Sequence, residues 1–430
     1  MLFRNAALAD GRRRDVRVEG ERIEAVDTGL SPREGERVRD ADGRLLLPGA
    51  VDAHVHFREP GFSHKETWGT GSRSAAAGGV TTVVDQPNTD PPTTTGAAFD
   101  RKARLARSSV VDYGLNGGVT PDWAPDSLFD RPLCALGEVF LADSTGDMGI
   151  EAGAFREALE RAAAADVLVT VHAEDAGLFD EGATDRADAD AWSAYRTAEA
   201  EVAAVERAVE LADAAGARLH VAHTSTPEAV DLVADTPHTC EATPHHLLLD
   251  RSDLDELGTL GRMNPPLRSP ERRAGLYERL VDGRVDVVAT DHAPHTRAEK
   301  DAGIWAAPSG VPGVETMVPL LLALARDPDD PLTVARVCEA TATAPAALLG
   351  LPEKGRVREG ADADLALFEA EPRPVRGARL HSRCGWTPFE GGAAPFPALT
   401  LLRGGVAYER GDGGERFGPA RGENVRSDAR

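Results

Sequence analysis

Residues 48–61 of the 430-residue chain read PGAVDAHVHFREPG, and this stretch decides how the remaining sequence is interpreted. The run Leu46–His56 predicts a β-strand, in which residues two apart share one face. His54 and His56 therefore project together from the carboxyl end of that strand. Two imidazoles placed in this way suit a divalent metal of the zinc type.

The same arrangement recurs farther along the chain. His172, His223 and Asp291 each follow an apolar run that predicts a strand. A lone His-x-His pair is a weak signal of metal binding, since histidines also serve as ordinary core or surface residues. Its recurrence at the carboxyl ends of four separate strands is what favours a metal site, because barrel active sites lie at that end.

The central part of the sequence alternates between two patterns. Apolar β-rich runs are separated by alanine-rich amphipathic stretches such as Ala152–Ala164 and Ala198–Ala214. The eight expected strands are Leu46–His56, Gly79–Val84, Val110–Asn116, Leu133–Leu141, Val167–His172, Arg218–Ala222, Thr239–Glu241 and Val285–Thr290. Alternating strands and helices predict an α/β fold with parallel strands, either doubly wound or closed as a (β/α)8 TIM barrel.

Both ends of the chain have a different pattern, with short strands and turns. We expect residues 1–47 and 350–410 to form one small β domain beside a catalytic barrel of residues 48–349. Residues 355–360, 364–368, 399–403 and 406–410 are the strand candidates of the second segment. Residues 411–430 are polar and charged, which predicts a flexible tail.

Charge excludes several function classes. The chain has 71 acidic and 48 basic residues, and its formal net charge of −23 would repel nucleic acid. No apolar run is long enough for a membrane span, and arginines soon interrupt the apolar start, so a signal peptide is not expected. The four cysteines form no Cys-x-x-Cys pair, which fits a reducing compartment. We expect a soluble, cytoplasmic protein without nucleic-acid or membrane partners.

Lysine is scarce: only four occur, so 44 of the 48 basic residues are arginine. A GC-biased genome also exchanges lysine for arginine, but it does not account for the acidic excess. The combination therefore favours a cytoplasm rich in salt, in which screening weakens the repulsion between carboxylates.

In this order along the chain, the motifs resemble the dihydroorotases of the amidohydrolase superfamily. The resemblance rests on residues 48–61, 65–67, 75–84, 87–89, 171–175, 220–225, 241–246, 263–268, 289–295, 310–315 and 360–364. It spans residues 46 to about 408 and implies a barrel with a composite β-sandwich domain built from both termini. The implied activity is the reversible, zinc-dependent cyclisation of N-carbamoyl-L-aspartate to L-dihydroorotate in pyrimidine (UMP) biosynthesis.

The resemblance also implies the metal ligands. His54 and His56 would hold the more buried zinc with Asp291, and His172 and His223 would hold the second. A metal-bound hydroxide would be the nucleophile, with Asp291 as the catalytic acid and base.

The group that bridges the two metals is where the sequence departs from much of the superfamily. Many relatives use a carboxylated lysine at the end of the fourth strand, but residues 137–146 contain no lysine. Some dihydroorotases place an aspartate there, and Asp143 is the expected bridge. Glu138, or a site with a single metal, is the alternative.

For the substrate, the resemblance assigns Arg58, Asn88 and His295 to the carboxylate of dihydroorotate or carbamoyl aspartate. A guanidinium offers a carboxylate a planar fork of donors. Asn264 and the backbone near residues 308–310 would hold the amide edges of the ring. Thr296–Ser309 is either a mobile lid over the barrel mouth or an inert surface insertion.

Other functions stay open at this stage. A hydantoinase or allantoinase is one alternative, although its substrate would have no use for Arg58, and a hydantoinase would need the missing lysine. A non-catalytic scaffold, for instance for aspartate transcarbamoylase, is another. An active enzyme could also form a homodimer or associate with that transcarbamoylase.

Overall fold

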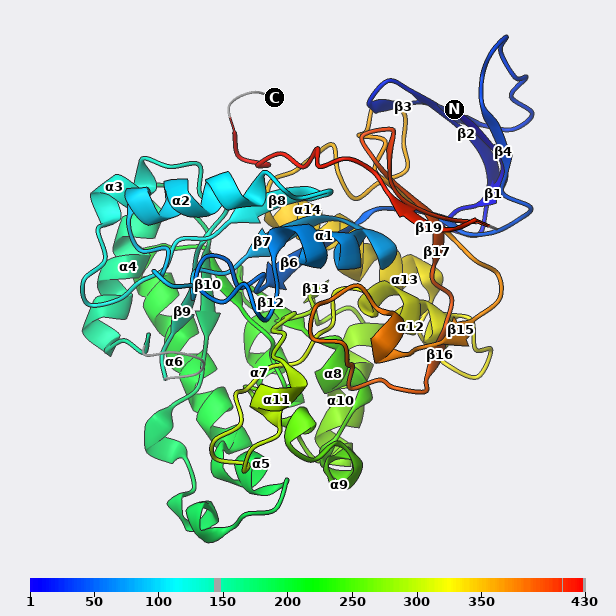
Figure 1. Cartoon of the computed structure of the whole chain (residues 1–430). Coiled ribbons are helices and arrows are strands. Elements are labelled where there is room, and N and C mark those ends of the chain that lie inside the picture. Colours follow the sequence, from blue (N-terminus) through cyan, green and yellow to red (C-terminus); the bar gives the residue numbers. More distant parts are fainter. Residues whose placement is uncertain (143–147, 412, 428–430) are drawn as a thin grey trace.

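The computed structural model describes residues 1–142, 148–411 and 413–427, and a closed barrel of parallel strands is its centre (Figure 1). Its strands in chain order are β6 (Ala50–Val55), β7 (Val80–Asp85), β8 (Asp112–Leu115), β9 (Leu136–Phe140), β10 (Val169–His172), β11 (Leu219–Val221), β12 (Thr239–Ala242) and β13 (Val287–Val288). All neighbours pair in parallel. Single bridges from Gly117 to Leu136 and from Val55 to His292 close the ring. The expected barrel is confirmed.

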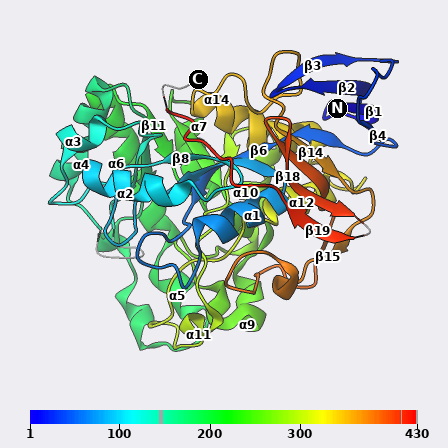
Figure 2. The ribbon, with the colours of Figure 1, turned by 45° about the horizontal axis from the view of Figure 1, so that its top comes forward.

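Helices surround the barrel (Figure 2). The longer ones are α1 (Trp68–Ala77), α2 (Gly96–Ala106), α4 (Ala152–Ala164), α6 (Ala198–Ala215), α7 (Pro227–Ala234), α10 (Pro270–Val281) and α12 (Met317–Ala325). The remaining ones are α3 (Pro125–Phe129), α5 (Ala191–Tyr195), α8 (Pro244–Leu248), α9 (Leu254–Leu257), α11 (Arg297–Lys300), α13 (Val334–Cys338) and α14 (Ala344–Leu348). Local sequence explains where the helices begin and end. At the start of α6, the Thr197 side chain accepts a hydrogen bond from the Ala200 amide, and the helix ends at Gly216, whose φ is 64°.

Strands from both ends of the chain lie together beside the barrel (Figure 1). One sheet contains β1 (Leu2–Ala7), β2 (Arg13–Glu19), β3 (Arg22–Asp27) and β4 (Val38–Asp40). The other has the order β19-β18-β17-β14-β5, with β5 (Leu46–Pro48), β14 (Leu365–Phe368), β17 (Pro397–Leu402), β18 (Gly405–Gly411) and β19 (Gly414–Phe417). A small ribbon of β15 (Arg373–Pro374) and β16 (Ala393–Ala394) completes the strands. Side chains of both sheets, such as Phe3, Val16, Leu365 and Leu401, share one core.

The first expected strand is two strands. Leu46–Pro48 pairs with β14 in the outer sheet, and only Ala50–Val55 belongs to the barrel. The chain crosses between the sheets at Gly49, where a Cβ atom would lie 2.2 Å from Thr81 Oγ1. Apolar character continues through this crossing, so the sequence pattern did not reveal it.

The expectation of a flexible tail from residue 411 is wrong for most of that segment. β19 pairs with β18, and Tyr113 of the barrel exchanges backbone hydrogen bonds with Glu423 and Val425. These bonds use the main chain, so the segment needs little apolar sequence. Residues 355–360, in contrast, form turns rather than a strand.

Three of the four lysines are buried and hold segments together. Lys354 Nζ lies 2.8 Å from Asp112 of β8 and 2.5 Å from Asp364, and so joins the barrel to the outer domain. Lys102 Nζ lies 2.5 Å from Asp85. Lys300 Nζ donates to the carbonyls of Arg262, Pro308 and Gly310. Among the described residues, none of the helices has both the length and the apolar character that a membrane crossing requires.

Candidate metal centre

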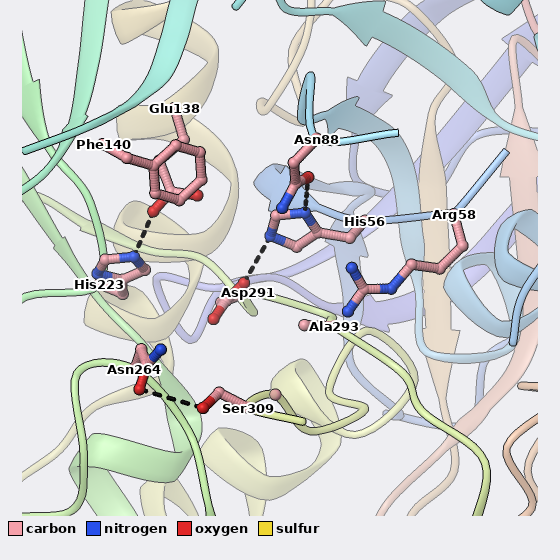
Figure 3. A pocket seen from close by; sticks show the side chains of 11 residues that line it. His56, Arg58, Asn88, Glu138, Phe140, His223, Asn264, Asp291, Ala293 and Ser309 are labelled. Carbon is pink, nitrogen blue, oxygen red and sulfur yellow. Dashed lines mark hydrogen bonds and ion pairs between the residues drawn. The ribbon is translucent and has the colours of Figure 1, made fainter. Parts of the chain in front are cut away.

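Side chains from five barrel strands meet around one cavity at the carboxyl ends of the strands (Figure 3). The cavity is lined by His56, Arg58, Asn88, Glu138, Phe140, His223, Asn264, Asp291, Ala293, Ser309 and Gly310. His54 and His172 lie directly behind them and are buried. Five of the predicted ligands, His54, His56, His172, His223 and Asp291, are therefore together. Asp143 lies outside the described residues.

Glu138 of β9 is at the middle of this group. Its Oε1 lies 2.5 Å from His223 Nε2 and 3.3 Å from His172 Nδ1, and its Oε2 lies 3.3 Å from His54 Nε2. One carboxylate thus faces histidines on both sides: one oxygen faces His172 and His223, and the other faces His54. Its backbone is fixed by Gln86, whose Oε1 accepts the Glu138 amide at 2.8 Å.

Asp291 faces His54 and His56. Its Oδ1 lies 2.9 Å from His56 Nε2 and 3.5 Å from His54 Nε2. His54 Nε2 is buried and makes no hydrogen bond within the described part of the chain. A buried ring nitrogen directed at two carboxylates and left without a hydrogen bond is what a metal ligand requires.

Each of three histidines is held by an acceptor at its other ring nitrogen. His54 Nδ1 lies 2.6 Å from Glu241 Oε1, and His56 Nδ1 lies 2.7 Å from Asn88 Oδ1. His172 Nε2 lies 3.0 Å from Glu174 Oε2, which also accepts from Arg196. Such contacts fix the ring and its tautomer, and they leave one nitrogen of each ring directed at the centre.

The imidazoles and carboxylates of the centre shift one another's pKa. Burial raises the pKa of Glu138, but the imidazoles of His54 and His223 outweigh this effect and hold that pKa well below its usual value. Burial also lowers the pKa of His54, and the carboxylates of Glu138 and Glu241 raise it well above its ordinary value. Ligand atoms of His54, His56 and Asp291 lie within 4.8 Å of one another, as do those of His54, Glu138 and His223. Imidazoles combined with carboxylates fit a divalent ion such as zinc.

The backbone is strained at three of these positions. Arg58, His223 and Asp291 have φ angles of 65°, 34° and 43°, in the left-handed region that non-glycine residues seldom adopt. All three lie just beyond a barrel strand and direct a side chain into the cavity. Strain of this kind persists where the surrounding structure fixes a residue for a specific task.

Arg58 lies beside His56, on the side of the cavity away from His223 (Figure 3). Its Nε donates to Pro294 O at 3.2 Å and its Nη2 lies 3.1 Å from His295 Nε2, while the residue itself lines the cavity. Burial lowers its pKa to about 10, so it stays cationic at neutral pH. Asn88 and Asn264 line the same space, as predicted.

His295 does not line the cavity. Its Nδ1 lies 3.1 Å from Lys65 Nζ, and its Nε2 lies 2.9 Å from Ser309 O. An ammonium group only donates, so Nδ1 is the acceptor and Nε2 carries the proton. Burial, with the nearby cations, lowers the pKa of His295 well below its usual value. The neutral ring lies behind Arg58, with Nη2 of Arg58 3.1 Å away.

The segment Thr296–Ser309 is tied to its surroundings. Glu299 accepts from His64 and lies 3.2 Å from Lys65 Nζ. On the other side, Arg262 donates to Ile304 O, in addition to the contacts of Lys300. These contacts place the segment against the cavity walls rather than apart from the site.

Several functional positions were not singled out from sequence. Glu241 and Glu174 hold histidine rings, and Gln86 holds Glu138. Glu138 itself was only the alternative bridge, although a charged residue inside the apolar strand Leu136–Phe140 is a usable signal.

Comparison with known proteins agrees with this geometry. The family model described as Dihydro-orotase-like matches residues 43–229. A dihydroorotase of Halobacterium salinarum is 63% identical over 428 residues, which cover 99% of both chains. A dihydroorotase of Methanosarcina acetivorans is 42% identical over 413 residues, 92% of this chain and 88% of that one. Among solved structures, an L-hydantoinase (dihydropyrimidinase) from Arthrobacter aurescens has a TM-score of 0.90 at 30% identity and covers 96% of both chains.

Proposed function

The chain belongs to the dihydroorotase family, and on that premise we propose how its cavity interconverts N-carbamoyl-L-aspartate and L-dihydroorotate, a step of pyrimidine biosynthesis. One observation carries the proposal: four imidazoles, two carboxylates and a buried guanidinium converge on one space at the carboxyl ends of the barrel strands. The imidazoles and carboxylates fit metal ions, and the guanidinium fits a substrate carboxylate.

The metal cofactor is zinc, with two ions per chain. His54, His56 and Asp291 would hold one ion, and His172 and His223 would hold the other. Glu138, the alternative bridge from sequence, would join them, because one of its oxygens faces His54 and the other faces His172 and His223. When bound, zinc supplies a Lewis acid that polarises a carbonyl and lowers the pKa of water.

Asp291 moves the proton. It lines the cavity, and its strained backbone directs its carboxylate toward the space between the histidines and Arg58. In the hydrolytic direction Asp291 accepts the proton of the attacking water and delivers it to the ring nitrogen that leaves. In the cyclising direction it takes the proton of the ureido nitrogen as that nitrogen attacks the side-chain carboxyl, and it delivers the proton to the carboxyl oxygen that leaves as water.

Arg58 and Asn88 bind the substrate carboxylate. The guanidinium edge of Arg58 faces the cavity because Nε is already bonded to Pro294 O. The Asn88 oxygen accepts from His56, so its amide nitrogen is the group that donates to substrate. His295 contributes indirectly, by packing behind Arg58.

The hydantoinases share the fold but fit this cavity less well. All four lysines lie in the described part of the chain. Lys102, Lys300 and Lys354 are buried in other contacts, and Lys65 contacts His295 and Glu299, so none is available as a carboxylated bridge. A hydantoin ring carries no carboxylate for Arg58. A cytoplasmic location, a homodimer and an association with aspartate transcarbamoylase stay predictions from sequence.

Substrate competition tests the assignment. Purified protein in high KCl should hydrolyse dihydroorotate and cyclise carbamoyl aspartate, with little turnover of dihydrouracil or hydantoin, which lack the carboxylate. Arg58→Met should abolish that preference, because turnover of the substrates that carry a carboxylate should fall. Faster turnover of hydantoin than of dihydroorotate by the unmodified chain would favour the hydantoinase alternative.

A further inference from the structure

Asp85, the last residue of β7, holds the backbone just before Arg58. Its Oδ1 accepts the Phe57 amide at 2.6 Å, and Phe57 lies between His56 and Arg58 in the chain. The Asp85 side chain is buried. A buried carboxylate oxygen that accepts one particular amide fixes the course of the backbone at that residue. The direction of Arg58 therefore depends on where the Asp85 carboxylate lies.

Lys102 holds that carboxylate from outside the barrel. It belongs to α2, it is 0% exposed, and its Nζ lies 2.5 Å from Asp85 Oδ2. The same ammonium donates to the carbonyl of Gln86, the next residue along the chain. One oxygen of Asp85 thus faces the ammonium and the other faces the Phe57 amide, so the orientation of the carboxylate is fixed on both sides.

Arg58 depends on this support because its backbone is strained. Its φ is 65°, and its carbonyl accepts the Phe62 amide at 2.9 Å in the turn that follows. The Phe57 ring packs edge-on against Trp68, with ring centres 5.2 Å apart, and a Cβ atom on Gly71 would lie 2.6 Å from that ring. Phe57 is therefore held by its main chain and by its side chain, and a fixed neighbour is what lets strain at Arg58 persist.

A buried ion pair at this place does what apolar side chains could not. Taking two charges out of water is costly, and apolar side chains of similar volume often give equal stability. Burial lowers the pKa of Arg58, while Asp291 and Asp85 raise it, so Asp85 lies close enough to act on the guanidinium. Lys102 compensates for the charge of Asp85, which would otherwise compete with the substrate carboxylate for Arg58.

We propose that Lys102 is a positioning residue for substrate binding, which orients the Asp85 carboxylate and, through the Phe57 amide, directs Arg58 toward the substrate. The proposal rests on the proposed function, in which Arg58 binds the substrate carboxylate. Neither Lys102 nor Asp85 is among the residues that line the cavity, so both act through the backbone. The carboxylate that Arg58 binds does not react, so loss of positioning should appear in KM rather than in kcat.

Two double variants test the hydrogen bond without leaving a buried charge. Lys102→Met combined with Asp85→Asn removes both charges but keeps an oxygen that can accept the Phe57 amide, whereas Lys102→Met combined with Asp85→Ala removes the oxygen as well. The KM for dihydroorotate and for carbamoyl aspartate should be roughly 10- to 100-fold higher in the alanine variant, the range that a small misplacement produces. The kcat values should differ less than about threefold. Equal KM values in the two variants would overturn the proposal.

Lys102→Met alone should also raise both KM values, by about 10-fold or more. Lys354→Met is the matched control, because its ammonium is buried as well and lies 2.8 Å from Asp112 and 2.5 Å from Asp364, away from the cavity. It should lower the melting temperature and leave both KM values unchanged. The same rise in KM for both lysine variants would show a general loss of packing and would overturn the proposal. If Lys102→Met does not fold by itself, the two double variants decide.

A double-mutant cycle with Arg58 completes the test. In an Arg58→Met background, adding Lys102→Met should raise KM no further, since the group that it positions is gone. An equal rise in both backgrounds would overturn the proposal. The metal content of Lys102→Met should match that of the unmodified chain, and loss of metal would place the effect at the metal centre instead and overturn the proposal too. An unmodified chain inactive on both compounds would contradict the proposed function.

Discussion

Replacement of Arg58 by methionine removes the cation to which the substrate carboxylate is assigned. Arg58 is 3% exposed and contacts Pro294 O and His295, and none of the six metal-ligand candidates is among its hydrogen-bond partners. Its Nε is already used. Its Nη2 lies 3.1 Å from His295 Nε2, which carries a proton and does not accept, so the edge of the two terminal nitrogens is left for a carboxylate. Two hydrogen bonds from a charged donor contribute about 1.5 to 3 kcal/mol each.

The expected loss is therefore about 3 to 6 kcal/mol in kcat/KM, or roughly 150- to 20,000-fold, for the reaction in either direction. Arg58→Lys keeps the charge but cannot present the fork, and should lie between methionine and the unmodified chain. Steady-state kinetics give the ratio, and metal analysis of the same samples gives the zinc content, which should not change. Unchanged kcat/KM in Arg58→Met, or loss of zinc from it, would refute the role.

Four further changes have defined outcomes. Glu138→Gln should lower the metal content and reduce kcat by more than about 100-fold, which exceeds the usual effect of replacing a residue that only holds a metal ligand in place. Full metal retention with unchanged kcat would count against Glu138 as the bridging ligand. Lys300→Met leaves the carbonyls of Arg262, Pro308 and Gly310 without their donor and should lower the free energy of unfolding by about 3 to 6 kcal/mol in urea titrations. Burial lowers the pKa of His381, but Glu315 and Glu415 outweigh it and raise that pKa above 6.5. The stabilisation that His381→Gln removes should therefore be full below pH 6.5 and shrink as the pH rises through the folded-state pKa; a constant difference would exclude the ion pairs. Finally, a net charge of −23 predicts a melting temperature that rises between about 0.1 M and 1 M KCl, as the screening length falls from about 10 Å to 3 Å.

The barrel was accessible from sequence because each strand is short, apolar and separated from the next by an amphipathic helix. All eight expected strands overlap an observed barrel strand, and α4 has the predicted bounds. The structure of the terminal segments was harder to predict from sequence. The crossing at Gly49 lies within continuous apolar sequence, and the contacts of Glu423 and Val425 with Tyr113 use backbone groups that leave no pattern in the side chains.

Individual strand ends identified the histidines and Asp291, because strand direction alone places them at one end of the barrel. Strand direction does not reveal which residues reach across the barrel interior. Glu138 lies in the middle of β9, and only closure of the barrel brings its side chain between His54 and His223. His295 shows the opposite case, since its motif position implied a substrate contact and its hydrogen bonds with Ser309 and Lys65 direct it elsewhere.

One measurement tests the central claim most directly: metal content and dihydroorotase activity determined on the same sample, before and after chelation, in high KCl. We predict two zinc ions per chain, interconversion of dihydroorotate and carbamoyl aspartate that the chelator abolishes, and recovery on addition of zinc. A folded, fully metallated chain that acts on neither compound would contradict the account.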